Sequence, residues 1–240
     1  LRRFELAAFV LVHGAYHGGW CWRDVAQCLR SQGHRVWTPT MTGLGERAHL
    51  ATKETDLETH IQDIVAVIDG EDIADAVLVG HSYGGIVVGG VADRRQEQFQ
   101  ALVLVDALIP ENGKSVLDFQ DAERRATLLA AAAEFDGWRL PPISAAVYGV
   151  SDPELAAWTD AKCVPHPLAT FQQPLELNGA WLKVPRKTYI RCTQTPLPYM
   201  DAFADRAADD PDWSLYLLET GHDCMITEPD RLAAMLMAQL

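Results

Sequence analysis

The chain has 240 residues, of which 48% are hydrophobic and 22% charged, so its composition is that of a globular protein with room for one large domain. Its formal net charge of −13 argues against nucleic acid and anionic membranes as partners. The chain has five cysteines, an odd number, and none of them form a C-x-x-C pair, so neither a disulfide framework nor a zinc site is expected. This cysteine content favours a reducing, cytoplasmic location.

The first part of the chain alternates short apolar runs with helix-like stretches. Strands are expected at residues 7–12, 34–38, 76–79 and 101–105, and helices at 22–32, from 55 to about 69 and from 84 onward. Gly33 marks the end of the first helix, and Thr55 with Glu58 forms a capping box that begins the second. The first apolar run is far shorter than a membrane span. Alternating strands and helices predict a mostly parallel sheet with helices on both faces.

This alternation stops between residues 110 and 179. The segment contains an Ala-rich stretch at 122–135, several prolines and little strand signal, and a structureless loop of such length would be unusual. We therefore expect a helical cap at 110–179, inserted into a core of residues 1–109 and 180–240. The rhythm resumes with a strand at 186–192, a helix at 198–208, a strand at 213–218 and a last helix that opens at Pro229, which brings the sheet to about six strands.

One short motif points to catalytic chemistry. Gly80-His81-Ser82-Tyr83-Gly84 matches G-x-S-x-G, and it follows an apolar strand and precedes a helix. In this setting the serine lies on a strained turn that exposes its hydroxyl, and the flanking glycines avoid clashes with the sheet and the helix. A glycine-rich turn with an incidental serine is the alternative, but the strand–turn–helix context favours Ser82 as a nucleophile.

A serine nucleophile needs a base to remove its proton and an oxyanion hole to stabilise the intermediate. In enzymes with this motif the base follows the last strand, and of the eight histidines only His222 lies there. The oxyanion hole takes one backbone N–H from the residue after the nucleophile, Tyr83, and another from the loop after the first strand, where Ala15 is the candidate. His13, in the same loop, is expected to shape the loop rather than to catalyse.

Three segments together resemble the α/β-hydrolase superfamily: residues 10–20 (VLVHGAYHGGW), residues 79–85 (VGHSYGG) and the Gly221-His222 pair. The nearest branch is the plant methylesterase and hydroxynitrile-lyase group with its bacterial esterase relatives. The resemblance covers almost the whole chain and is weakest in the cap. It implies an α/β-hydrolase fold and a serine esterase that uses no metal and no cofactor.

The chain departs from that branch in the position of the triad acid. Plant esterases of this kind carry the acid just after the strand that follows the cap, where this chain reads CTQTP at 192–196, without a carboxylate. Some lipases of this fold place the acid at the end of the strand after the nucleophile helix, which is the position of Asp106. The order Ser82, Asp106, His222 also suits the superfamily, so Asp106 is the expected acid.

Three alternatives to this assignment stay open. Asp201 is the second candidate for the acid. Asp223 is a weaker one, because it is too close to His222 in sequence to orient the imidazole easily. Asp106 itself could serve only as a strand-end residue that caps the next turn.

Other activities on the same fold are also alternatives. Hydroxynitrile lyases carry a lysine near the catalytic histidine and a bulkier residue in place of Gly14, whereas residues 223–225 here contain no lysine, so both differences favour an esterase. A cofactor-independent dioxygenase, which uses the His–Asp pair as a base, is a second alternative. A non-catalytic small-ligand receptor is a third, although the intact Ser82 and His222 argue against it.

The expected substrate is a small or medium, neutral, apolar or aromatic ester, since pockets over such sheets are mostly apolar. Aromatic residues near the mouth and in the cap are expected to line the pocket: Tyr16, Trp20, Trp138 and Trp158. The acidic surface disfavours anionic substrates. Bacterial relatives include esterases that hydrolyse methyl carbamates of benzimidazoles, so Ser82 is expected to carry an acyl or carbamoyl group. Beyond this small molecule no nucleic acid or membrane partner is expected, and both a monomer and a homodimer fit the sequence.

Overall fold

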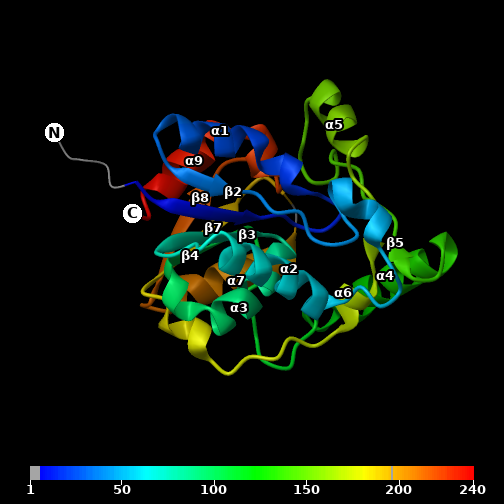
Figure 1. Cartoon of the computed structure of the whole chain (residues 1–240). Helices are drawn as coiled ribbons and strands as arrows, with labels where there is room; N and C mark the ends of the chain where they lie inside the picture. Colours follow the sequence, from blue (N-terminus) through cyan, green and yellow to red (C-terminus); the bar gives the residue numbers. More distant parts are fainter. Residues whose placement is uncertain (1–5, 196) are drawn as a thin grey trace.

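A parallel sheet forms the centre of the molecule (Figure 1). The computed structural model describes residues 6–195 and 197–240; residues 1–5 and 196, which the expected core includes, lie outside the described residues. The strands run in the order β2-β1-β3-β4-β7-β8, and every neighbouring pair is parallel. Their bounds are β1 Ala8–Val12, β2 Arg35–Trp37, β3 Ala76–His81, β4 Phe99–Val105, β7 Arg186–Cys192 and β8 Trp213–Leu218. The expected sheet of about six strands is confirmed.

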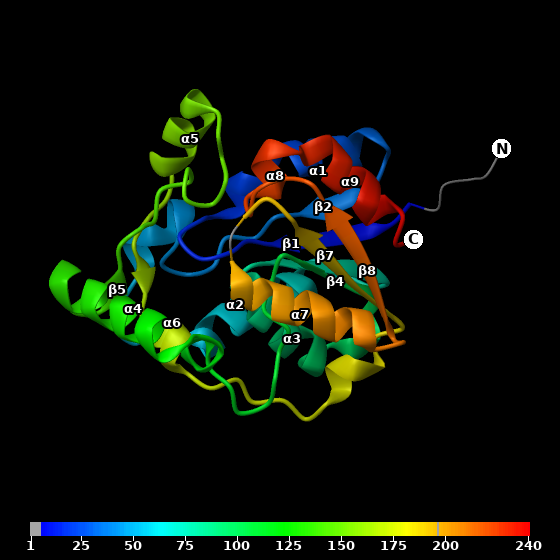
Figure 2. The ribbon, with the colours of Figure 1, turned by 180° about the vertical axis from the view of Figure 1, so that it is seen from behind.

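Helices cover both faces of the sheet (Figures 1 and 2). One face carries α1 (Arg23–Ser31), α8 (Cys224–Thr227) and α9 (Pro229–Met237), and the other carries α2 (Leu57–Gly70), α3 (Gly84–Arg94) and α7 (Pro198–Asp209). Successive strand side chains point to opposite faces, so each strand contributes to two cores. Phe9 and Leu11 pack in the cluster beneath α1 and α9, whereas Val10 packs in the larger cluster beneath α2 and α3. Burial on both faces explains why the central strands are apolar throughout.

The register of β3 and β4 brings two predicted site residues to one edge of the sheet. His81 at the end of β3 pairs with Val105 at the end of β4, so the next residues, Ser82 and Asp106, leave the sheet side by side. The Ser82 N–H donates to the Val105 carbonyl at 3.3 Å, and the Asp106 N–H donates to the Ile190 carbonyl on β7 at 2.7 Å. Residues far apart in the sequence therefore meet at the carboxyl ends of three adjacent strands.

The segment between β4 and β7 lies beyond that edge of the sheet (Figures 1 and 2). Helices are its main regular structure, and its longest helix, α4, spans Ala122–Phe135 as the sequence predicts. The remaining elements are η4 Val116–Phe119, α5 Pro153–Asp160, α6 Ala169–Gln172, η5 Ala180–Lys183 and the strands β5 Arg139–Leu140 and β6 His166–Pro167. The two strands form an antiparallel ribbon that the sequence did not reveal, because each has only two residues. The division into core and cap at residues 110 and 179 stays a prediction.

The expected capping box of α2 is wrong by one residue. Asp56 is the N-cap, its Oδ1 accepts from the Thr59 N–H at 2.9 Å, and the Thr59 hydroxyl approaches the Asp56 N–H at 3.5 Å. Thr55 instead accepts a hydrogen bond from the Thr52 N–H at 3.0 Å, and Glu58 pairs with Arg94. Asp56 and Thr55 are both good N-cap residues, and the sequence alone does not separate them. Short 3₁₀ helices also form at η1 Gly19–Trp22, η2 Gly45–Leu50 and η3 Gln96–Gln98.

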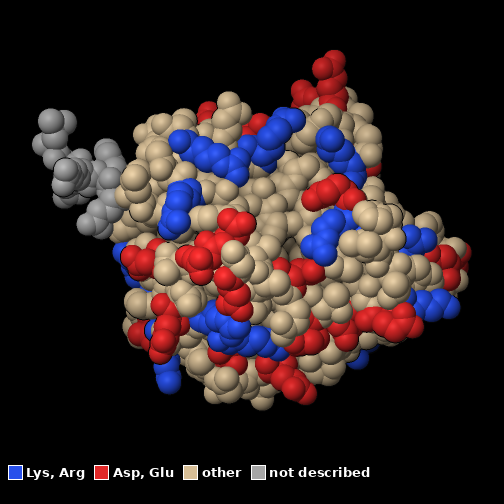
Figure 3. All heavy atoms as spheres, viewed as in Figure 1, with Lys and Arg blue, Asp and Glu red and all other residues tan. Residues whose placement is uncertain are grey.

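The surface charge is mixed rather than uniform. On the face drawn in Figure 3, basic side chains cross the region of α1, and acidic side chains are more frequent in the lower half. The net charge of −13 is therefore distributed over a surface that also carries many cations. Over the described part of the chain, no helix is both long and apolar enough to span a bilayer.

Candidate active site

The turn at Ser82 is strained in the way that the motif predicts. Ser82 has φ of 54°, in the left-handed region that residues with a side chain rarely adopt. Its flanking glycines are required by space: a Cβ on Gly80 would lie 2.7 Å from the Gly84 carbonyl oxygen, and a Cβ on Gly84 would lie 2.7 Å from the His13 carbonyl oxygen. The serine side chain is half-buried and faces a cavity, so a small molecule in that cavity can reach its hydroxyl.

Asp106 is fully buried and its two oxygens have separate partners. Oδ2 lies 2.6 Å from His222 Nδ1, and Oδ1 accepts from Arg191 Nη1 at 2.7 Å and from the Cys192 N–H at 3.1 Å. Burial raises the pKa of Asp106, but the hydrogen bond and charge of His222 together with the charge of Arg191 outweigh it, so the net pKa lies below the usual value. The carboxylate is therefore ionised and directed at the imidazole.

The loop that carries His222 is fixed from two sides. Its N–H donates to the Tyr148 carbonyl at 2.7 Å, and its carbonyl accepts from His81 Nε2 at 3.0 Å. Burial lowers the pKa of His81 to about 3, so this neighbour of Ser82 is neutral. Among the described residues the Ser82 hydroxyl has no hydrogen-bond partner; in ligand-free enzymes the bond between nucleophile and base is often long and shortens when substrate binds.

Two backbone N–H groups beside Ser82 are free to bind an oxyanion. Within residues 6–195 and 197–240, neither the Ala15 N–H nor the Tyr83 N–H donates a hydrogen bond. Tyr83 is the N-cap of α3, where the helix dipole also favours negative charge. A Cβ on Gly14 would lie 3.0 Å from Ser82 Cβ, so the loop of Ala15 passes close to the nucleophile. His13 shapes that loop by donating from Nδ1 to the Gly14 carbonyl at 2.8 Å.

The other two aspartates have different partners. Asp201 has a side chain that is 65% exposed and contacts Arg191 at 2.8 Å rather than His222. Asp223 is fully buried, and its nearest cationic partner is His17 Nε2 at 3.5 Å. Arg191, which joins Asp106 to Asp201, was not anticipated. A charged residue near the end of the apolar strand β7 was the available signal, because a buried guanidinium needs an acidic partner.

The cavity in front of Ser82 has a volume of about 50 Å³, which is small beside typical ligand pockets. It lies between the sheet edge, α4 and α7. Of the four aromatic residues expected to line it, only Tyr16 does so. The lining residues are Ala15, Tyr16, Ser82, Tyr83, Leu108, Val116, Gln120, Arg124, Leu128, Ile143, Tyr148, Phe171, Tyr199 and Met200.

The three predicted pocket tryptophans lie elsewhere. Trp20 stacks on His17 with ring centroids 5.3 Å apart, and Trp158 meets Trp20 edge-on at 5.4 Å, so both hold α5 against the loop after β1. Trp138 lies beneath the guanidinium of Arg139 at 4.7 Å. Residue type alone does not distinguish tryptophans that pack between other elements from those that face Ser82.

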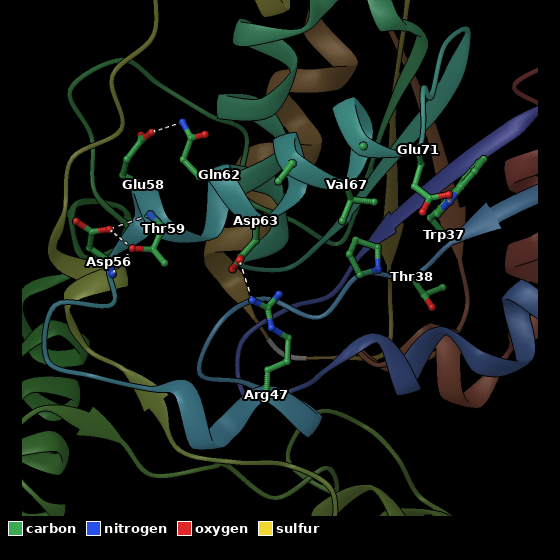
Figure 4. A pocket seen from close by; sticks show the side chains of 13 residues that line it. Trp37, Thr38, Arg47, Asp56, Glu58, Thr59, Gln62, Asp63, Val67 and Glu71 are labelled. Atoms are coloured by element: carbon green, nitrogen blue, oxygen red, sulfur yellow. Dashed lines mark hydrogen bonds and ion pairs between the residues drawn. The ribbon is translucent and has the colours of Figure 1, made fainter.

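A separate groove of about 1090 Å³ lies along α2 (Figure 4). Its polar groups are paired with one another: Arg47 Nη2 contacts Asp63 Oδ1 at 3.2 Å, and Trp37 Nε1 donates to Glu71 at 3.3 Å. It shares no lining residue with the cavity at Ser82. Three or more metal-ligating side chains do not come together within the part of the chain that the structure describes.

Known proteins resemble the chain along almost its whole length. A family model described as "Alpha/beta hydrolase family" matches residues 9–235. A carbendazim hydrolyzing esterase from Nocardioides sp. (strain SG-4G) is 41% identical over 242 residues, covering 97% of this chain and 99% of that protein. Methylesterase 2 from Arabidopsis thaliana is 28% identical over 205 residues, covering 82% and 72%. An extracellular alpha/beta-hydrolase structure from a Paenibacillus species superposes with a TM-score of 0.84 at 23% identity, covering 97% and 98%.

Proposed function

The chain belongs to the alpha/beta hydrolase family, and from that membership we propose that it is a carboxylesterase-type serine hydrolase whose substrates include methyl carbamates of heteroaromatic amines. The 2.6 Å contact between Asp106 and His222 supports this proposal most directly. It holds the imidazole proton on Nδ1 and leaves Nε2 to accept the proton of Ser82. The similarity to a carbendazim hydrolyzing esterase along almost the whole chain supports the carbamate as substrate.

In the first half of the reaction, the Ser82 hydroxyl attacks the carbonyl carbon while His222 takes its proton. The Ala15 and Tyr83 N–H groups bind the oxyanion that forms, and removing one such donor typically costs about 10²–10³ in rate. His222 then gives the proton to the leaving methoxide, so the carbon–oxygen bond breaks and methanol departs. Ser82 is left as an acyl ester or, with a carbamate substrate, as a carbamoyl ester.

In the second half, water takes the place of the alcohol. His222 accepts a proton from the water while the hydroxide adds to the carbonyl, and it then returns that proton to Ser82 Oγ as the Ser82–carbonyl bond breaks, which restores the free hydroxyl and the neutral imidazole. An ester substrate yields a carboxylic acid. A carbamate yields a carbamic acid, which loses carbon dioxide to give the free amine. Each step needs only water and the residues named above.

Two further expectations belong to this proposal. The five cysteines are free thiols, which supports a reducing, cytoplasmic environment for the enzyme. A homodimer remains compatible with the chain, and size-exclusion chromatography with light scattering would distinguish it from a monomer.

Hydrolysis of p-nitrophenyl acetate and of methyl benzimidazol-2-ylcarbamate by the wild type and by Ser82→Ala tests the proposal. We expect kcat to fall by about 10⁴-fold or more in Ser82→Ala on both substrates, because the nucleophile is lost while the fold is kept. Mass spectrometry of the wild type during turnover should detect the added acyl or carbamoyl group. Ser31→Ala, an exposed serine on α1, is the matched control and should retain full activity.

Activity that survives in Ser82→Ala would contradict the serine mechanism and favour a dioxygenase that uses the His–Asp pair alone. Oxygen consumption with a heteroaromatic substrate would then be the decisive assay. A wild type that binds the carbamate but turns over neither compound would instead support a non-catalytic receptor.

A further inference from the structure

Two side chains that line the cavity at Ser82 each carry a buried polar atom without a partner among the described residues. Among the described residues, Arg124 Nε and Gln120 Oε1 are buried and make no hydrogen bond. Both side chains line the same cavity as Ser82, Gln120 just after η4 and Arg124 on α4. Leaving a buried donor or acceptor unpaired destabilises a protein, so an orphaned pair in a cavity points to a ligand that satisfies it.

The neighbouring arginine on α4, Arg125, has protein partners that Arg124 Nε lacks. Arg125 donates to the Leu117 carbonyl at 2.8 Å and contacts Asp118 at 3.0 Å, so its charge has partners within the cap. Among the described residues that line the cavity, Arg124 has the only charged side chain. Its guanidinium lies 5.8 Å from the centre of the Tyr199 ring. Burial raises the pKa of Tyr199, and the charge of Arg124 opposes this rise, so the two groups act on each other inside the cavity.

The chemistry of the pair restricts what can bind. Arg124 Nε–H is a donor and requires an acceptor on the ligand. Gln120 Oε1 is an acceptor and requires a donor. A carboxylate offers only acceptors and would leave Gln120 Oε1 without a donor, while a plain phenyl group offers neither a donor nor an acceptor. A ring nitrogen beside an N–H group offers one acceptor and one donor. A benzimidazole that carries an N–H substituent at position 2 has such an edge.

We propose that Arg124 and Gln120 recognise the acid-side group of the substrate as a neutral edge that carries a hydrogen-bond acceptor beside a donor. This inference rests on the proposed esterase function and names the substrate class of the same site. The pair selects heteroaromatic carbamates over phenyl carbamates and over half-esters of dicarboxylic acids. Charges on the outer surface do not determine this selectivity, because the deciding side chains line the cavity.

The test measures kcat/KM for three substrates: methyl benzimidazol-2-ylcarbamate, methyl phenylcarbamate and monomethyl succinate. The enzymes are the wild type, Arg124→Met, Gln120→Met and, as a control, Arg206→Met, which alters an exposed arginine on α7 paired with Glu111. The wild type should prefer the benzimidazolyl substrate. Arg124→Met should lower kcat/KM for that substrate by about 10- to 100-fold and Gln120→Met by about 5- to 10-fold, with less than about a 3-fold change on the phenyl substrate.

Equal losses on the benzimidazolyl and phenyl substrates would overturn the proposal, because they would indicate a general packing role. A wild type that prefers monomethyl succinate, with a preference that disappears in Arg124→Met, would also overturn it and indicate an anion site. If the wild type hydrolyses neither carbamate nor p-nitrophenyl acetate, the esterase proposal itself fails. If it hydrolyses p-nitrophenyl acetate and both carbamates without discrimination, only the recognition proposal fails.

Discussion

Asp106 and Asp223 are both fully buried beside the loop of His222, yet their surroundings differ. The oxygens of Asp106 are held by His222, Arg191 and the Cys192 N–H at 2.6 to 3.1 Å. Within the described residues neither oxygen of Asp223 has a hydrogen-bond partner, and its contact with His17 is an ion pair at 3.5 Å. Burial alone therefore does not identify a catalytic acid. What separates the two is that Asp106 has one oxygen fixed by the protein and the other directed at the base.

The two carboxylates also contact different histidines of the site. In the triad chemistry, the acid has to hold one tautomer of the imidazole and stabilise its positive charge. In the proposed mechanism Asp106 fills this role from the end of β4, where its φ is 44° and its Oδ2 lies 2.6 Å from His222 Nδ1. Asp223 faces His17 in the loop after β1, so its charge connects two loops of the site without touching the imidazole of the base.

Exchanging each carboxylate for an amide is the strongest way to test this contrast. We expect Asp106→Asn to lower kcat by about 10⁴-fold, because the amide no longer holds the required tautomer of His222. Asp223→Asn should stay within about tenfold of the wild type. Initial rates with p-nitrophenyl acetate measure both, and circular dichroism checks that each variant is folded. A loss in Asp223→Asn as large as that in Asp106→Asn would remove the distinction between the two sites.

Substituting Arg191 should have a smaller effect on activity, and it tests how Asp106 is held. Arg191→Met removes the charged donor from Oδ1, and we expect kcat/KM to fall by about 10- to 100-fold as the carboxylate loses its anchor. Arg191→Lys keeps a cation beside Asp106 and should restore most of the activity, which a mere packing role would not predict. Asp201→Asn is the control: its carboxylate holds only the outer side of Arg191, so activity should change less than about 3-fold. A severe loss in Asp201→Asn would return it to consideration as the acid.

Much of the fold could be predicted from local pattern. The strands Arg186–Cys192 and Trp213–Leu218 and the helix Ala122–Phe135 lie where apolar runs and an Ala-rich stretch placed them. These signals are local, and tertiary packing reinforces them. The ribbon of β5 and β6 was missed because its strands pair over a sequence separation that no local pattern records. The start of α2 was predicted one residue too early, because Thr55 and Asp56 are both suitable N-cap residues.

The residues of the candidate site also separate into those that the sequence predicts and those that depend on tertiary packing. Ser82 and His222 could be placed from the motif and from chain order. The proximity of Asp106 to His222 follows from strand order, which the sequence constrains but does not specify. The pocket could not be predicted: Trp20 and Trp158 pack against each other, and Trp138 lies against Arg139. Residue type shows that a side chain is large and apolar, but only its tertiary packing shows whether it faces Ser82.

The pH dependence of stability tests the Asp223 side of the comparison. Burial lowers the pKa of His13 to about 3, of His60 to about 4 and of His81 to about 3, so these residues are neutral in the folded protein. Unfolding below pH 6.5 lets each take up a proton, and the free energy of unfolding therefore falls with acidification. His17 behaves in the opposite sense. Burial lowers its pKa, but Asp223 outweighs burial and raises it above the usual value.

Because the folded state holds a proton on His17, this pair stabilises the protein below the unfolded pKa, and the contribution is lost as pH rises through the raised pKa. In Asp223→Asn, His17 should become another neutral buried histidine. The free energy of unfolding, measured in urea at pH 7.5 and pH 5.5, should then decrease on acidification by at least about 1 kcal/mol more in the variant than in the wild type. Equal decreases would mean that Asp223 does not hold a proton on His17, and that the second carboxylate is buried without a charged partner.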